Sequence, residues 1–182
     1  MSFSVVIPAR FAATRLPGKP LLDIAGKPML QRTYEQALQS RADRVVIATD
    51  DERIQSVAQG FGATVCMTKS SHVSGTDRIQ EVSCQLGMSE SDLVVNVQAD
   101  EPLIPPRVIN QVADNLKQDS GVGIATLCET ITSQEEIVDS NSVKVVFDHL
   151  GHALYFSRAT IPWQGSASAK NCYRHIGIYA YR

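Results

Sequence analysis

Short runs of β-branched residues alternate along this chain with segments in which apolar residues recur at helical spacing. Strand-like runs occupy 44–49 and 92–97, whereas 29–41 and 51–61 have the apolar spacing of helices. Alternating strands and helices build βαβ units, in which the strands are parallel and helices cover the sheet. The alternation therefore predicts an α/β fold of Rossmann-like type, with a mostly parallel sheet and helices on both faces.

The pattern changes after Gly121. Strand-like segments at 143–147 and 153–157 flank the turn residues Asp148–Gly151, which predicts a β-hairpin and therefore a small lobe beside the sheet. Cys128 falls in another strand-like run, and its apolar neighbours predict that this thiol is buried.

The last strand-like segment, 174–182, reaches the end of the chain. A domain of this kind seldom ends within a strand, so we expect the natural protein to continue further. A chain of 182 residues is most simply one domain, so residues 1–182 are predicted to form a single one. Ser133 and Glu136 have the spacing of a capping box, which predicts a short helix over Ser133–Val138.

Charge and cysteine usage exclude several classes of protein. The chain has 17 basic and 19 acidic residues, a formal net charge of −2, which does not favour binding to nucleic acid or to a membrane surface. No apolar run approaches the ~18 residues of a membrane helix, and the N-terminus lacks the order of a signal peptide. The four cysteines form no CxxC pair, which favours free buried thiols in a reducing compartment. We predict a cytoplasmic protein.

A basic stretch follows the first strand, with Arg10, Arg15 and Lys19 within ten residues. Open α/β sheets bind ligands at the carboxyl ends of their strands. Arginine forks and a mobile lysine ammonium suit a polyphosphate. The stretch has neither the dinucleotide fingerprint nor the P-loop spacing, and an exposed basic loop without a ligand is the alternative.

Acidic residues follow a second strand. Asp100 and Glu101 come directly after the run that ends near Val97, so they should face the same sheet edge as the basic stretch. Mg²⁺ takes one or two carboxylates together with phosphate oxygens, so Asp100 is a predicted metal ligand. The alternative is an acid pair that merely precedes a helix near Pro105. Gln98 is placed to hydrogen-bond a sugar or a base, and the alternative is that it bonds only its neighbours.

A third set of polar residues begins a later helix. Ser74 and Gly75 form a nest-like loop that can accept an anion or a base edge. Arg78 lies in the first helical turn, where a cation opposes the helix dipole. This placement favours a ligand or an acidic partner such as Asp77, and a solvated arginine is the alternative.

Two further features have plainer interpretations. Asp50 or Asp51 is expected to cap the helix that follows it. His175 begins the last strand-like segment, where a lone histidine is more often structural than catalytic.

Taken together, these segments resemble the bacterial CMP-Kdo synthetases, the 3-deoxy-manno-octulosonate cytidylyltransferases. The matching text is IPAR at 7–10, TRLPGKPL at 14–21, GKPM at 26–29, ATDD at 48–51, SGTDRI at 74–79, VVNVQADEPLI at 94–104, VKVVFD at 143–148, ALYFSR at 153–158 and RHIGIYAYR at 174–182. The resemblance implies transfer of CMP from CTP to the anomeric hydroxyl of Kdo, with release of pyrophosphate, for lipopolysaccharide synthesis. It also implies Mg²⁺ as cofactor and a homodimer formed through the hairpin region.

The resemblance also implies roles for individual residues. The nucleotide residues are Pro8, Ala9, Arg10, Arg15, Lys19, Ser74, Gly75 and Asp100, of which Arg10, Arg15 and Lys19 act in catalysis and Asp100 holds the metal; the sugar residues are Arg78, Gln98 and His175. The chain departs from the family with Ala99 in place of glycine and Ala13 in place of serine, and the family continues past RHIGIYAYR into a segment with a second metal-binding aspartate. The alternatives are a nucleotidyltransferase for another acidic sugar and an inactive nucleotide-binding remnant.

Overall fold

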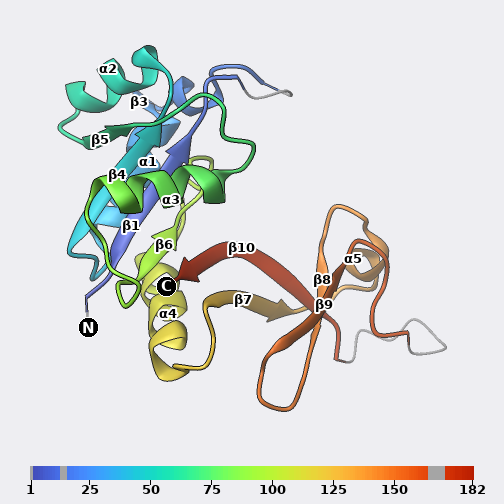
Figure 1. Cartoon of the computed structure of the whole chain (residues 1–182). Helices are drawn as coiled ribbons and strands as arrows, with labels where there is room; N and C mark the ends of the chain where they lie inside the picture. The colour runs from blue at the N-terminus through green and yellow to red at the C-terminus, as the bar shows by residue number, and fades with distance from the viewer. Residues whose placement is uncertain (1, 13–15, 164–170) are drawn as a thin grey trace. The chain divides into compact units, whose positions relative to one another are not determined.

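A computed structural model describes residues 2–12, 16–163 and 171–182 (Figure 1). The chain forms two compact units, the first comprising Met1–Ala125 with Ile178–Arg182 and the second comprising Thr126–Gly177.

The first unit contains the parallel sheet that the sequence predicts. Its strands are arranged in the order β5 (Thr64–Met67), β4 (Arg44–Thr49), β1 (Ser4–Ala9) and β6 (Val94–Asn96), and all neighbouring pairs are parallel. The end of β10 (Tyr173–Tyr181) then pairs antiparallel with β6. The carboxyl ends of β1 and β6 consequently lie beside each other at one edge of the sheet.

Helices cover both faces of this sheet (Figure 1). The helix α3 (Gly75–Gln85) packs on one face, where it buries Val6, Val46 and Val94 of three adjacent strands. Side chains of a strand alternate between faces, so Val5 points to the opposite side.

The other face belongs to helices from different parts of the chain. The helices α1 (Met29–Leu38) and α4 (Pro106–Gln118) contact each other and the strands β1 and β6 respectively. The backbone N–H of Arg41, just after α1, donates to Asn110 Oδ1 of α4 at 2.8 Å. The helix α2 (Glu52–Gly60) contacts β4 and β5. The predicted fold class is thus confirmed.

The second unit contains the predicted hairpin. The strands β8 (Lys144–Phe147) and β9 (Ala153–Ser157) pair antiparallel, and β8 also pairs with the start of β10. The strand β7 (Ile124–Thr130), which begins in the first unit, pairs with β10, and the short helix α5 (Gln134–Val138) lies between β7 and β8 in sequence.

Lys144 is the buried cation of this unit. Its side chain is fully buried, and its ammonium donates to the backbone carbonyls of Asp139, Ser142 and Arg158 at 2.7, 2.7 and 2.8 Å. A buried ammonium needs such acceptors, since an unpaired charge in the interior is costly. The sequence analysis did not single out this residue.

Some local expectations were wrong. Ser133 precedes α5 but makes no side-chain capping bond, so the expected capping box is absent from this described segment. Cys84 is exposed because it lies on the side of α3 away from the buried Ile79 and Val82. Cys128 is exposed because it alternates along β7 with the buried Leu127.

Three small elements between β1 and α1 were not expected from the sequence. They are the 3₁₀ turn η1 (Lys19–Leu21) and the two-residue strands β2 (Asp23–Ile24) and β3 (Lys27–Pro28), which pair antiparallel. They were missed because runs of two or three residues have no readable period. Among the described residues, no helix has the length and apolar character needed to cross a lipid bilayer.

Candidate functional site

A cavity of about 240 Å³ opens at the carboxyl ends of β1 and β6. Its lining comes from parts of the chain that are far apart in sequence, at positions 8, 10, 19–20, 75 and 98–100. The lining residues are Pro8, Arg10, Lys19, Pro20, Gly75, Gln98, Ala99 and Asp100. The structure therefore brings the predicted basic stretch, the start of α3 and the predicted metal ligand to one place.

Lys19 and Asp100 face each other in this cavity. The Lys19 ammonium lies 2.6 Å from Asp100 Oδ2, and the two side chains are 38% and 47% exposed. An ion pair this exposed contributes only about 0–1 kcal/mol. Each partner can therefore exchange the other for a stronger ligand, a phosphate for Lys19 and a cation for Asp100.

A tight turn places Lys19. Gly18 has a φ of 72°, and its backbone N–H donates to the carbonyl of Phe11 at 2.8 Å. A side chain at position 18 would lie 3.1 Å from the Phe11 ring as well as being strained by the positive φ. Glycine is therefore required here, and the turn delivers the next residue, Lys19, to the cavity.

One of the two terminal nitrogens of Arg10 has a hydrogen-bond acceptor among the described residues, and the other has none. Its Nη1 donates to the carbonyl of Val73 at 3.2 Å. Its Nη2 is buried and has no hydrogen-bond partner among the residues that the structure describes. A buried donor without an acceptor is unfavourable, so this nitrogen is suited to an anionic oxygen that enters the cavity.

The start of α3 forms another part of the wall. Ser74 Oγ accepts from the backbone N–H of Asp77 at 3.1 Å, and the backbone N–H of Ser74 donates to Asp77 Oδ2 at 3.0 Å. The Ser74 hydroxyl also donates to Asp77 Oδ2 at 2.8 Å, and this bond, followed by the one from the Ser74 N–H, lowers the pKa of Asp77. Ser74 is thus engaged in capping, whereas Gly75 lines the cavity at a helix N-terminus, where anions are stabilised.

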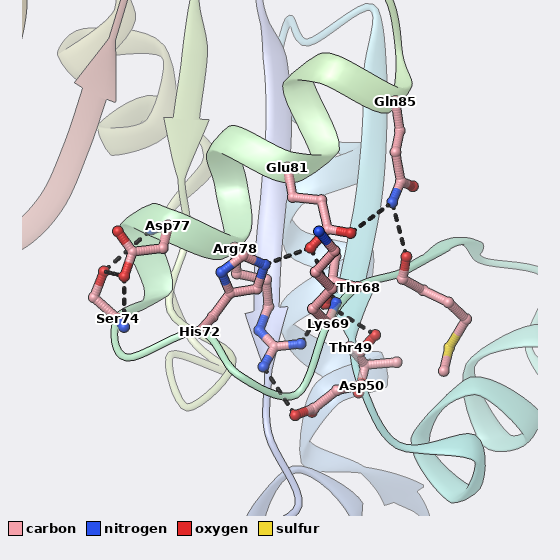
Figure 2. A network of polar contacts seen from close by, with 11 residues as sticks. Thr49, Asp50, Thr68, Lys69, His72, Ser74, Asp77, Arg78, Glu81 and Gln85 are labelled. Atoms are coloured by element: carbon pink, nitrogen blue, oxygen red, sulfur yellow. Dashed lines mark hydrogen bonds and ion pairs between the residues drawn. The ribbon is translucent and has the colours of Figure 1, made fainter.

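Arg78 is not among the residues that line the cavity. Figure 2 shows that it points instead toward Asp50 and Thr68. Its side chain is fully buried, its Nη2 lies 3.1 Å from Asp50 Oδ2, and its Nη1 donates to Thr68 Oγ1. The expectation that Asp77 pairs with Arg78 was wrong, because the Asp77 carboxylate is bonded to Ser74 in the helix cap. The alternative of a solvated arginine was wrong too.

Asp50 and Asp51 have separate roles. Asp51 accepts from the backbone N–H of Arg53 at 3.0 Å and caps α2 as expected. The Arg53 side chain also binds this carboxylate and lowers its pKa. Asp50 instead neutralises Arg78.

His175 and Arg174 belong to the second unit, where both have structural partners. Arg174 pairs with Glu129 and with Glu136, the latter at 3.2 Å. His175 Nε2 lies 2.9 Å from Thr126 Oγ1, and burial lowers the pKa of this imidazole. The predicted role of His175 near the sugar stays a prediction.

The other residues predicted from the sequence to belong to the site lie near the end of β1 and after β6, or outside the described residues. Pro8 and Ala9 end β1, with Ala9 fully buried, and Arg15 lies outside the described residues. Ala99 is not among the described non-glycine residues with positive φ, so alanine is tolerated there without strain. Its carbonyl accepts from Thr33 Oγ1 at 3.0 Å. Thr33 was not identified from the sequence because a threonine inside a helix has no distinctive pattern.

One acidic side chain, Asp100, lines the cavity. In the described part of the chain there is no group of three or more His, Cys, Asp or Glu side chains that could hold a metal on its own. One exposed carboxylate next to the predicted phosphate-binding residues Arg10 and Lys19 nevertheless fits Mg²⁺, which keeps several waters and shares phosphate oxygens.

Comparison with known proteins adds to this geometry. The sequence profile of a family described as cytidylyltransferase matches residues 4–182. A 3-deoxy-manno-octulosonate cytidylyltransferase of Cellvibrio japonicus (strain Ueda107) is 60% identical over 192 residues, covering 100% of this chain and 75% of that protein. One of Vibrio cholerae serotype O1 (strain M66-2) is 57% identical over 189 residues, again covering 100% of this chain and 75% of that protein.

Solved structures agree with these relatives. A structure of CMP:2-keto-3-deoxy-manno-octonic acid synthetase in complex with CTP superposes with a TM-score of 0.91 at 45% identity, covering 100% of this chain and 74% of that one. A cytidylyltransferase from Leptospira borgpetersenii shares the fold, with a TM-score of 0.60 at 23% identity over 68% of this chain and 52% of that one.

Proposed function

Since this chain belongs to the cytidylyltransferase family, among the 3-deoxy-manno-octulosonate cytidylyltransferases, we propose that it transfers CMP from CTP to the anomeric hydroxyl of Kdo and releases pyrophosphate. The observation that carries this proposal is the cavity in which Lys19 and Arg10 meet Asp100. It offers two cations for a triphosphate and a carboxylate for the accompanying metal.

The cations have distinct parts in this reaction. The unpaired Nη2 of Arg10 binds a phosphate oxygen. The Lys19 ammonium exchanges Asp100 for the bound triphosphate, and in this position it stabilises the charge that develops on the α-phosphate and the leaving pyrophosphate. Such groups accelerate the reaction because they are already aimed at the site where charge appears. Gln98, at the same wall, is placed to hydrogen-bond the nucleoside or the sugar.

The direct test is pyrophosphate release from CTP, measured with and without Kdo. Release that depends on both substrates supports the proposal. Pyrophosphate release with another acidic sugar but not with Kdo would show that the acceptor is that other sugar. CTP binding without any turnover would favour a nucleotide-binding protein that is not an enzyme. We further propose that the reaction serves lipopolysaccharide synthesis, as the names of the relatives imply. The cytoplasm is proposed as its location because free cysteines are typical of a reducing compartment.

Mg²⁺ is proposed as the cofactor, with Asp100 as its protein ligand. When bound, the metal would neutralise phosphate charge and polarise an oxygen of the substrate. The release of Asp100 from Lys19 frees its carboxylate for this purpose.

The variant Asp100→Asn keeps the shape of the side chain and removes its charge. We expect it to lower turnover by about 10²-fold or more at saturating CTP, and to raise the Mg²⁺ concentration needed for half-maximal rate. A titration of pyrophosphate release against Mg²⁺ measures both effects. The matched control is Asp92→Asn, an exposed aspartate outside this cavity, and wild-type Mg²⁺ dependence in Asp100→Asn would contradict the metal role.

A homodimer is proposed from the second unit. The hairpin strand β9 exposes Leu154, Tyr155 and Phe156, whose exposed fractions are 66%, 65% and 41%. Adjacent exposed apolar side chains on one strand are typical of an interaction surface, and the resemblance of this region to the dimer-forming part of the family indicates a second copy as the partner.

The double variant Leu154→Lys, Tyr155→Lys is expected to convert the dimer to a monomer, because two charges would be buried at the interface. Light scattering after size-exclusion chromatography measures the mass directly. A wild-type protein that is monomeric at micromolar concentration would contradict the proposal, as would an unchanged dimer in the variant.

A further inference from the structure

The segment from Lys69 to Ser74 leads from β5 into α3 and provides a hydrogen-bond acceptor to Arg10, which lines the cavity. The carbonyl of Val73 binds Arg10 Nη1 at 3.2 Å. The side chain of Val73 is 89% exposed, so packing of this residue does not hold the carbonyl in place. Its position depends on what anchors the segment on either side.

Glu81 of α3 provides the anchor on one side (Figure 2). Its Oε2 accepts from the backbone N–H of Lys69 at 3.0 Å and also contacts His72 Nε2. Its Oε1 accepts from Gln85 Nε2 at 3.2 Å, and the same nitrogen donates to the carbonyl of Met67 at 2.9 Å. One carboxylate thus ties both ends of the 69–72 stretch to the second turn of the helix.

Asp77 provides the anchor on the other side through its capping bonds with Ser74. Val73 therefore lies between two residues, His72 and Ser74, that are each bonded to a side chain of α3, Glu81 and Asp77 respectively. The hydrogen bond from His72, followed by that from the Lys69 N–H, lowers the pKa of Glu81, so its carboxylate is charged at neutral pH. A charged acceptor makes these bonds stronger than neutral ones.

We propose that Glu81, with His72, is a positioning residue for the nucleotide site, because it fixes the Val73 carbonyl that orients the guanidinium of Arg10. Neither side chain lines the cavity, so both act through Arg10 and not on the substrate. The inference rests on the proposed function, since it assigns Arg10 to CTP.

The variant Glu81→Ala tests this positioning role, since alanine keeps the helix and removes the carboxylate that binds the Lys69 N–H and His72, while the Asp77–Ser74 bonds remain. We expect the dissociation constant for CTP to rise about tenfold, the size of effect expected for one charge-assisted hydrogen bond. Glu81→Gln, which retains an acceptor for the Lys69 N–H, should recover part of this loss. The matched control is Glu90→Ala, an exposed glutamate outside the cavity, which should bind CTP like the wild type.

A double-variant cycle separates positioning from general destabilisation. In an Arg10→Ala background, Glu81→Ala should change CTP affinity by less than about twofold, because the group it positions is gone. Faster hydrogen exchange of the Lys69 amide in Glu81→Ala, with an unchanged circular dichroism spectrum, would confirm the loss of the anchor in a folded protein.

Two results would overturn the inference. One is wild-type CTP affinity in Glu81→Ala, and the other is an equal loss of affinity with and without Arg10. A wild-type protein that binds no CTP would refute the proposed function instead, so the two failures are distinguishable.

Discussion

Replacing Lys19 with alanine is expected to lower the rate of pyrophosphate release by about 10²–10³-fold, the loss typical of a group that stabilises developing charge. The ammonium lies in the cavity beside Asp100, and its side chain is 38% exposed. Since Lys19 contributes little to the core, the free energy of unfolding should change by less than about 0.5 kcal/mol. Steady-state kinetics at fixed ionic strength, together with urea unfolding, measure both quantities.

Lys27→Ala is the matched control for this experiment. Lys27 is also a half-exposed lysine paired with a carboxylate, that of Glu35 at 2.7 Å, but it does not line the cavity. We expect near wild-type turnover from it. If Lys19→Ala retains both CTP affinity and rate, the cavity is not the triphosphate site.

Replacing Arg78 with alanine is expected to lower the free energy of unfolding by about 3 kcal/mol or more. The change empties the volume of a fully buried side chain and leaves Asp50 and Thr68 without the guanidinium that they bind. Asp50 is 20% exposed, so water can solvate it in part, which places the effect at the lower end for a broken buried pair. Urea unfolding at pH 7 gives the difference directly.

Two comparisons separate the contributions of charge and volume. Arg107→Ala removes an exposed arginine from the first turn of α4 and should change the free energy of unfolding by less than about 0.5 kcal/mol. The pair Arg78→Met with Asp50→Asn fills much of the volume without leaving a charge, so it should recover much of the loss. A fully stable Arg78→Ala protein with reduced sugar affinity would return Arg78 to the substrate site.

The outcome for Arg78 illustrates a limit of sequence patterns. Its place in the first turn of a helix correctly indicates that the cation needs an acidic partner. The partner is Asp50, which follows β4, and no sequence pattern links this residue with the distant helix α3. Arg174 is similar, since Glu129 and Glu136 reach it from other elements. Arg78 and Arg174 thus each have acidic partners within the protein.

The regular elements and the main site residues were determined by the sequence itself. The strands at 44–49 and 153–157 are found at the residues where they were expected, because apolar periodicity reports directly on the faces of each element. Lys19 and Asp100 could be paired in advance, because adjacent parallel strands deliver their carboxyl ends to the same edge of the sheet.

Only the tertiary structure decided which polar groups face the ligand and which face each other. Gln98 lines the cavity, Ser74 is engaged in a helix cap, and Glu81 holds the segment that orients Arg10. These differences depend on how α3 is rotated on the sheet and where the 69–74 segment returns to it. Such contacts join residues distant in the chain, so their geometry is set by packing of the whole unit and leaves no local period in the sequence.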